Sequence, residues 1–286
     1  MKKHLLRLRK WVASRVYDRK IVDCIGYYEN NPITCYYASK GNPFLVKLPL
    51  NRCRHLKYLG FECTFESKSP FIQTLREYAE GHHTTYAGSV LEKYYKTFQP
   101  QNVAGLMGLD QNQCNSVLIN TPAMGEIPVW NSGDPQAELK RRKWQIEQDN
   151  LLHGYNYKAD EGDPFYGPVS ERKGTLEFTR LIKTYHSIKE KGYTVSQNNS
   201  IKGVILKAEE GWRCQILAGQ HRIAALAALG FDNVAVLIGN EGIIRREDAE
   251  WWPMVQENII SEKQALWVFD RIFEGQPPEM ALKHLG

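Results

Sequence analysis

The sequence has no hydrophobic run approaching the roughly 18 residues that a membrane-spanning helix needs, so an integral membrane protein is not expected. Arg7, Arg9 and Lys10 interrupt the apolar stretch after the first lysines, and we therefore expect no signal peptide. The six cysteines are scattered and form no Cys-x-x-Cys pair. This spacing argues against zinc-ribbon and thioredoxin-type sites and is typical of a protein kept in a reducing cytoplasm.

An evenly spread basic charge is also missing. The net charge is +5, but residues 1–20 contain eight of the 37 basic residues and a single acid. That segment therefore carries +7, and the rest of the chain carries −2. A duplex-binding domain usually spreads its basic residues over a folded face, so this distribution argues against DNA as a partner.

The basic segment has the pattern of an amphipathic helix. Apolar residues recur at helical spacing within residues 2–20, namely Leu5, Leu8, Trp11, Val12 and Val16. A basic helix with a tryptophan on its apolar face is typical of segments that lie on an anionic membrane surface. The alternatives are that the same apolar stripe docks the helix on its own domain, or that the basic segment attaches to nucleic acid. Under the first interpretation, a cytoplasmic protein would be held at the inner face of a membrane.

The next region, residues 21–154, is the least regular part of the sequence. Alternating apolar residues predict short strands within residues 21–28 and 33–37. Helical spacing and capping residues predict helices near residues 74–80, 90–97 and 135–152. We expect this α+β region to supply the pocket for an acceptor substrate.

Residues 155–245 have a more orderly pattern of helix, strand, strand, helix and strand, which is typical of a compact α/β unit. The predicted elements are a helix over 174–191, strands over 203–207 and 212–217, a helix over 223–229 and a strand over 234–238. Residues 246–286 predict a helical tail, in which Ser261 and Gln264 occupy capping-box positions. The sequence thus predicts a mixed α/β fold of the α+β class, with a small mixed sheet.

The strongest functional signal is the turn Gly219-Gln220-His221-Arg222, which joins a predicted strand to a predicted helix. Glycine lets a backbone approach a ligand closely, and the first N–H groups of the helix then point at that ligand. His221 and Arg222 add side-chain donors, and arginine suits the paired oxygens of a phosphate. The turn is therefore a candidate phosphate site. The alternative is an ordinary turn whose arginine pairs with a surface carboxylate.

The residues around this turn carry a family resemblance. Residues 217–226 contain a G-x-H-R turn that leads into a helix, and Leu229-Gly230 and Val234-Ala235-Val236 follow it. Upstream, residues 187–193 have the form S-I-x-x-x-G. In this order and separation the motifs resemble the ParB/sulfiredoxin superfamily, and the resemblance covers about residues 160–240.

The resemblance implies that the turn binds the phosphates of a nucleotide, either ATP or alternatively ADP or CTP, together with Mg²⁺. The superfamily includes CTP-binding partition proteins, ATP-using sulfiredoxins and free-serine kinases. Sulfiredoxins have a catalytic cysteine where this sequence has Gln220, and Cys214 lies too early, within the preceding strand. Residues 246–286 do not resemble the helix-turn-helix domain of partition proteins. The small-molecule kinase branch is therefore the best match.

A kinase requires a base for the accepting hydroxyl and cations for the phosphates. In the serine-kinase relatives an essential glutamate lies near the start of the helix that ends in S-I-x-x-x-G. The resemblance thus points to Glu171 and Glu177 as candidate catalytic bases, with Lys173 placed to reach a phosphate. The alternative is that these acids simply stabilise a helix start. Carboxylates that could help to bind magnesium are Asp160, Glu161 and Asp163.

A polar loop over residues 81–89 is a second candidate site. Its hydroxyls and two histidines could hold an acceptor, so the candidate substrate-binding residues are His82, His83 and Ser89. Adjacent histidines point in different directions from a helix or a strand, and a metal site built from the pair is not expected. The alternative is a surface loop in which Ser89 caps the following helix.

Taken together, these patterns predict a cytoplasmic nucleotide-dependent phosphotransferase. Its acceptor would be a hydroxyl group of a small molecule, a sugar or a glycolipid. The alternative is a ParB-like nucleotide switch, or a DNA- or partner-binding module, that uses the same turn without transferring phosphate. Only the phosphotransferase requires a catalytic base.

Overall fold

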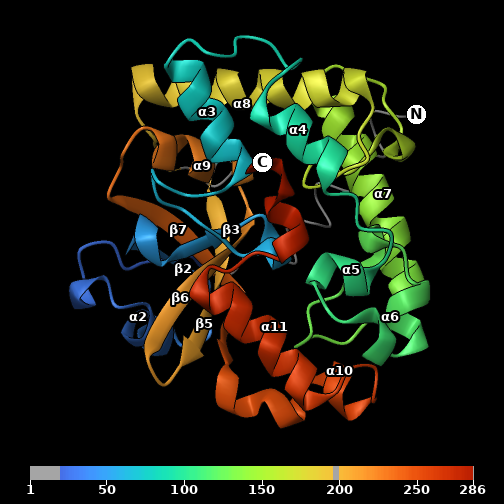
Figure 1. Cartoon of the computed structure of the whole chain (residues 1–286). Helices are drawn as coiled ribbons and strands as arrows, with labels where there is room; N and C mark the ends of the chain where they lie inside the picture. The colour runs from blue at the N-terminus through green and yellow to red at the C-terminus, as the bar shows by residue number, and fades with distance from the viewer. Residues whose placement is uncertain (1–19, 196–199, 286) are drawn as a thin grey trace, which may run out of the picture.

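The computed structural model describes residues 20–195 and 200–285 of the chain (Figure 1). The basic helix predicted over residues 2–20 lies, apart from Lys20, outside the described residues. Within the described ranges, no helix is both long enough and apolar enough to cross a membrane.

A mixed sheet forms the centre of the molecule. Its described strands are β1 (Val22–Asp23), β2 (Phe44–Pro49), β3 (Cys53–His55), β4 (Phe61–Glu62), β5 (Ile201–Ala208), β6 (Gly211–Ala218) and β7 (Asn233–Arg245). Their order is β1-β2-β7-β5-β6-β3-β4. The hairpin β5–β6 and the pair β2–β7 are antiparallel, whereas β5–β7 and β3–β6 are parallel. The predicted α+β class, with a mixed sheet, is confirmed.

The strand order joins the two regions that the sequence separates at residue 154. The three strands from residues 201–245 occupy the middle of the sheet, and strands from residues 22–62 flank them on both sides. On one side β2 pairs with β7 from Phe44 opposite Ile238 to Pro49 opposite Asn233. On the other side β3 pairs with β6. Residues on both sides of 154 therefore share one sheet.

Helices cover both faces of the sheet, because its central strand is apolar on both sides. In β5, Ile201 and Ile205 belong to one buried cluster, and Val204 and Leu206 belong to another. The first cluster packs under α3 (Pro70–Ala79), α4 (Val90–Thr97), α8 (Glu171–Lys191) and α9 (Gln220–Ala228). The second packs under α5 (Val103–Met107), α6 (Ser116–Asn120), α10 (Pro253–Gln256) and α11 (Glu262–Glu274). Figure 1 shows these two helical layers on opposite sides of the strands.

Several predicted helix boundaries are confirmed. Helix α8 is followed by Gly192, which has a positive φ, and α4 is capped by the Ser89 side chain. Ser261 and Gln264 form the predicted capping box of α11. The predicted helix over residues 135–152 is α7 (Pro135–Leu152), and it forms one wall of a cleft described below.

The predicted strand over residues 33–37 is wrong, because these residues belong to helix α2 (Pro32–Ser39). The Asn31 side chain accepts hydrogen bonds from the backbone of Ile33 and Thr34, at 2.9 and 3.3 Å. Proline then occupies the first helical position, where its fixed φ favours a helix. Asn-Pro is thus a helix start here rather than a hairpin turn, and the strand before it is only the two residues of β1.

His55 at the end of β3 gives the fold a testable sensitivity to acid. Its ring is fully buried, neither ring nitrogen has a hydrogen-bond partner among the described residues, and burial lowers its pKa from 6.5 to about 3. The unfolded chain therefore binds a proton below pH 6.5 that the folded chain excludes, so stability falls between about pH 6.5 and 3. In His55→Leu we expect the part of the acid-induced loss of unfolding free energy that His55 causes to disappear.

The expected difference is about 2 kcal/mol at pH 5, measured as the drop in unfolding free energy between pH 7.5 and pH 5 in urea titrations. Other titrating groups contribute equally to both proteins and cancel in the comparison. An identical drop in the wild type and the variant would contradict a neutral, unpartnered His55.

Candidate functional site

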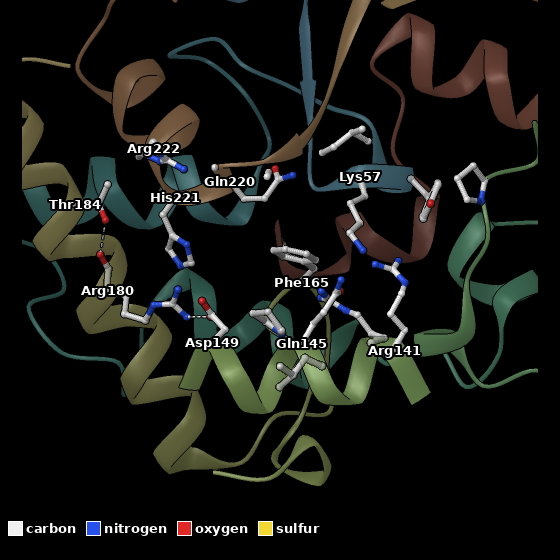
Figure 2. Close-up of a pocket in the computed structure, with 18 of the residues that line it drawn as sticks. Lys57, Arg141, Gln145, Asp149, Phe165, Arg180, Thr184, Gln220, His221 and Arg222 are labelled. Carbon is white, nitrogen blue, oxygen red and sulfur yellow. Dashed lines mark hydrogen bonds and ion pairs between the residues drawn. The ribbon is translucent and has the colours of Figure 1, made fainter. Parts of the chain in front are cut away.

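A large cleft opens between α7, α8 and the start of α9. Its volume is about 1410 Å³, and it brings together residues from both halves of the chain. Figure 2 shows α9 side chains on one side of the cleft and side chains from α7 and α8 facing them. The basic residues that line it are Lys57, Arg141, Arg142, Lys173, Arg180, Lys183 and Arg222. Its acidic lining residues are fewer, namely Asp134, Glu138, Asp149 and Glu241.

The predicted phosphate-binding turn lies at one end of this cleft. Gly219 follows β6 with φ 92°, and a Cβ added there would lie 2.9 Å from Ile201 Cγ1. Both the dihedral angle and the close approach require glycine. No side chain caps the first turn of α9, which leaves its backbone N–H groups available to an anion. We call residues 219–222 the cradle.

Gln220 holds the cradle in place through its side chain. Its Oε1 accepts a hydrogen bond from the Leu56 backbone N–H at 2.8 Å, and its Nε2 donates to the Ile216 carbonyl at 2.8 Å. The side chain is buried, and both of its polar groups are therefore satisfied within the protein. Any contact of Gln220 with a phosphate would be made by its backbone.

His221 extends from the cradle towards Arg180 and Asp149, whereas Arg222 lies beside the start of α9 (Figure 2). Arg222 is half-buried, and burial lowers its pKa while Tyr193 opposes that effect. An arginine so placed is still a cation at neutral pH. The His221 ring packs on Phe71 of α3, with 5.2 Å between ring centroids. Both side chains line the cleft.

Glu177 lies beneath the cradle and is completely buried. Its carboxylate is 2.5 Å from Lys173 Nζ, 2.9 Å from Arg180 Nη1 and 3.1 Å from His221 Nε2. Burial alone would raise the pKa of Glu177, but the adjacent His221 ring and the charges of Arg180 and Lys173 outweigh it. The pKa of Glu177 therefore lies far below its ordinary value, and the group is a carboxylate at neutral pH.

The cations around Glu177 are themselves held by α7. Arg180 donates to Asp149 at 2.7 Å, and the buried Lys173 ammonium donates to the Asn150 side chain. His153, just after α7, lies 3.8 Å from Asp149. This network ties α7, α8 and α9 together around the cleft and keeps its charged groups in fixed positions.

The middle of the cleft is built around Phe165 (Figure 2). Arg142 makes two hydrogen bonds to Asp163, at 2.7 and 2.8 Å, and its guanidinium lies 4.9 Å from the Phe165 ring centroid. Lys57 Nζ lies 5.6 Å from the same centroid and 2.9 Å from Glu126. The two cations beside Phe165, Arg142 and Lys57, are thus already matched by carboxylates.

The structure brings some of the predicted site residues together and separates others. Gly219, Gln220, His221, Arg222 and Lys173 line the cleft, and Glu177 contacts His221 from below. Glu171 is exposed at the first turn of α8 and lines a different groove of about 580 Å³, together with Tyr155 and Tyr157.

The predicted substrate-binding loop does not line the cleft. Ser89 is buried, and its hydroxyl donates to the Tyr86 carbonyl while capping α4. His82 and His83 lie near Glu80 and Glu77, at 3.4 and 3.6 Å. The structure thus gives this loop capping and surface ion-pair contacts.

The carboxylates considered for magnesium are largely engaged elsewhere. Asp163 is buried against Arg142, and Glu161 pairs with Arg172 and Ser170. Across residues 20–195 and 200–285, no group of three His, Cys, Asp or Glu side chains is arranged to hold a metal ion. A magnesium ion here would be held mainly by the phosphates of its nucleotide.

Sequence reasoning missed the α7 and α8 contributions to the cleft, chiefly Arg180, Asp149 and Arg141. One signal was present, since Lys173, Glu177 and Arg180 are spaced i, i+4 and i+7 and therefore share one helix face. The α7 residues gave no comparable signal. Their role depends on how α7 packs against the loop at Asp163.

Comparisons with known proteins return no match. A scan against protein-family models found none, and neither did searches of curated proteins and of solved structures. The chemistry of the cleft is therefore the basis for assigning a function.

Proposed function

We propose that this protein is a nucleotide-dependent phosphotransferase that transfers a phosphoryl group from ATP, or another nucleotide, to a hydroxyl group. The observation that carries the proposal is a single cleft that combines an uncapped helix start with an excess of cations and a buried carboxylate–histidine pair. Phosphoryl transfer depends mostly on positioning and charge stabilisation, and these are the features that such a cleft supplies.

The phosphates would lie on the cradle. The N–H groups at the start of α9 and the Arg222 guanidinium would hold phosphate oxygens, and Arg180 and Lys183 would offset the remaining charge. The resemblance of the turn to the ParB/sulfiredoxin superfamily supports the same placement. Magnesium bound to the nucleotide would neutralise part of the charge on the phosphates.

We assign the catalytic base to His221 rather than to a glutamate. A carboxylate with a pKa far below its ordinary value is a weak base, so Glu177 is suited to orienting His221 through Nε2. His221 lines the cleft and would present Nδ1 to the acceptor. It would take the proton of the acceptor hydroxyl as the new O–P bond forms. The bond from the γ-phosphorus to its bridging oxygen breaks, and the nucleoside diphosphate leaves.

Nucleotide binding is the direct test of the proposal. The melting temperature would be followed during titration with ATP, ADP and CTP, each with and without magnesium. At one hundred times the dissociation constant, binding stabilises a fold by about 2.7 kcal/mol, which corresponds to several degrees. Absence of a shift with every nucleotide would overturn the proposal. Binding followed by no transfer to any acceptor would favour the nucleotide-switch alternative.

The His221→Gln variant tests the assignment of the base. We expect it to bind nucleotide with nearly unchanged affinity while the rate of transfer falls by about 10²- to 10⁴-fold, as is usual on loss of a general base. The measurement is single-turnover transfer from γ-labelled ATP alongside calorimetric nucleotide binding. His186→Gln is the matched control, because His186 is exposed on α8 and bonds Tyr78 away from the cleft. Unchanged turnover in His221→Gln would contradict the assignment.

A further inference from the structure

The end of the cleft farther from the cradle differs from it chemically. We call this the distal end and define it by Tyr58, Asn131, Glu138, Arg141 and Glu241, which all line the cleft. The whole cleft of about 1410 Å³ exceeds the roughly 300–1,000 Å³ typical of a pocket for one small ligand. Figure 2 shows Phe165 and Gln145 between the cradle residues and Arg141. A second ligand therefore has room beside a nucleotide.

Tyr58 provides the most specific feature of the distal end. The residue is only 8 % exposed and lines the cleft, yet its hydroxyl makes no hydrogen bond to any residue that the structure describes. Burial, reinforced by Glu126, Glu138 and Glu241, raises its pKa well above the ordinary value. The hydroxyl is therefore neutral and able to donate a hydrogen bond. The hydroxyl is not among the fully buried polar atoms that lack a partner, so it is accessible from the cleft that Tyr58 lines, where a ligand or water can form a hydrogen bond with it.

The charges of the distal end argue against an anionic ligand there. Lys57 is paired with Glu126 at 2.9 Å, and Arg141 is paired with Glu138. Glu241 adds a further carboxylate to the lining. An anion at the distal end would face these carboxylates, and the cations nearest to it already have carboxylate partners.

Hydroxyl groups match the same residues well. A hydroxyl can donate to the carboxylates of Glu138 and Glu241 and can accept from Tyr58 or from the charged N–H groups of Lys57 and Arg141. The Asn131 and Gln145 amides add both donors and acceptors to the lining. The Phe165 ring supplies an apolar surface between the two ends. This combination of bidirectional hydrogen bonding with apolar surface suits a compact ring that carries several hydroxyls.

We propose that the distal end binds an uncharged polyhydroxylated ring, a neutral sugar or cyclitol, as the acceptor of the transfer. The role of the ring as acceptor rests on the proposed function, whereas binding of the ring at the distal end does not depend on that function. With the nucleotide on the cradle and the ring at the distal end, one hydroxyl of the ring would face His221 across the middle of the cleft.

The test is a direct binding measurement, in which saturation-transfer NMR detects binding of each probe to the protein. The neutral probes are glucose, galactose, N-acetylglucosamine and myo-inositol, and the charged probes are glucose 6-phosphate and glucuronate. We expect at least one neutral probe to bind and to bind more tightly than its charged counterparts. Binding of none of the neutral probes, or tighter binding of the charged ones, would overturn the proposal.

Tyr58→Phe locates the bound probe. We expect it to weaken binding of the neutral probe about tenfold, in line with the loss of a hydrogen bond on which a buried site depends. The melting temperature should not fall, because the hydroxyl that is removed bonds to no described residue of the protein. Tyr27→Phe, at an exposed position, is the matched control. Unchanged affinity in Tyr58→Phe would overturn the placement, and Glu241→Gln, at an exposed residue, provides a second test of it.

Failure of this site and failure of the proposed function give different results. Arg222→Ala should lose nucleotide affinity and keep the affinity for the neutral probe. If nucleotides bind neither to the wild type nor to Arg222→Ala while the neutral probe binds as described, the proposed phosphotransferase function is wrong and the proposed distal site is supported. If nucleotides bind and no neutral probe binds, the proposed sugar site at the distal end is wrong and nucleotide binding at the cradle is supported.

Discussion

Replacing Arg222 with alanine is expected to weaken nucleotide binding by about 100-fold. The half-buried guanidinium lines the cradle, where it would make charge-assisted and bidentate hydrogen bonds to phosphate. Losing such an interaction costs roughly 1.5–3 kcal/mol, or about one to two orders of magnitude in affinity. At a nucleotide concentration that stabilises the wild type by about 2.7 kcal/mol, the variant should gain only about 0.4 kcal/mol.

Thermal titration with ATP, ADP and CTP measures this difference as a shift of several degrees that falls to about one. Arg245→Ala is a suitable control, because Arg245 contacts Tyr37 and Glu247 and does not line the cleft. Equal shifts of the melting temperature in the wild type and in Arg222→Ala would contradict nucleotide binding at the cradle, independently of the result for Arg245→Ala.

Replacing Glu177 with glutamine is expected to destabilise the folded protein by about 3–5 kcal/mol, because it leaves a buried ammonium without its carboxylate. The carboxylate is fully buried, and Lys173 beside it is only 1 % exposed. Arg180 and His221 lose the same partner. Urea unfolding at pH 7 measures the loss, and Glu171→Gln on the exposed start of the same helix should change stability by less than about 0.5 kcal/mol.

The same carboxylate sets an acid limit to stability. Because the folded pKa of Glu177 lies below its ordinary value of 4.5, its contribution is complete above about pH 4.5. It is lost as the pH falls towards the folded pKa, because the unfolded chain then binds the proton more readily. The wild type should lose this advantage over Glu177→Gln on acidification. Equal stability of the two proteins at pH 7 would contradict a buried ion-paired role.

This result affects how activity in Glu177 variants is interpreted. A loss of turnover in Glu177→Gln would follow from disordering of Lys173, Arg180 and His221 even if the carboxylate never touches a substrate. Turnover must therefore be compared at a temperature where the variant is fully folded. His221→Gln avoids this difficulty, because it leaves the contacts of Glu177 with Lys173 and Arg180 in place.

The elements around the cradle could be predicted because their signals are local. The strand β6, the glycine turn and the helix α9 are contiguous in sequence, and the apolar stripe of α8 repeats at helical spacing over 21 residues. The predicted strand over residues 33–37 was wrong because Asn-Pro starts either a turn or a helix. The capping hydrogen bonds of Asn31 decide in favour of the helix.

The arrangement of the cleft could not be predicted in the same way. Glu177 and His221 lie 3.1 Å apart but 44 positions apart in sequence, and neither position carries a local sign of the contact. The sequence of helix α7 has the charge pattern of a solvent-exposed helix, yet its residues Arg142 and Asn150 are buried. Their burial depends on Asp163 and Lys173, so only the packed structure shows that α7 forms a wall of the cleft.

The strand order has a consequence for synthesis of the chain. Strand β2 is complete once residue 49 has been made, but its antiparallel partner β7 begins only at residue 233. A nascent chain therefore leaves the ribosome with β2 and β3 unable to pair with β7 and β6 until most of the protein has been translated. Such late, long-range pairing slows folding and leaves strand edges open to aggregation. Production at low temperature or with chaperones should therefore favour the folded product.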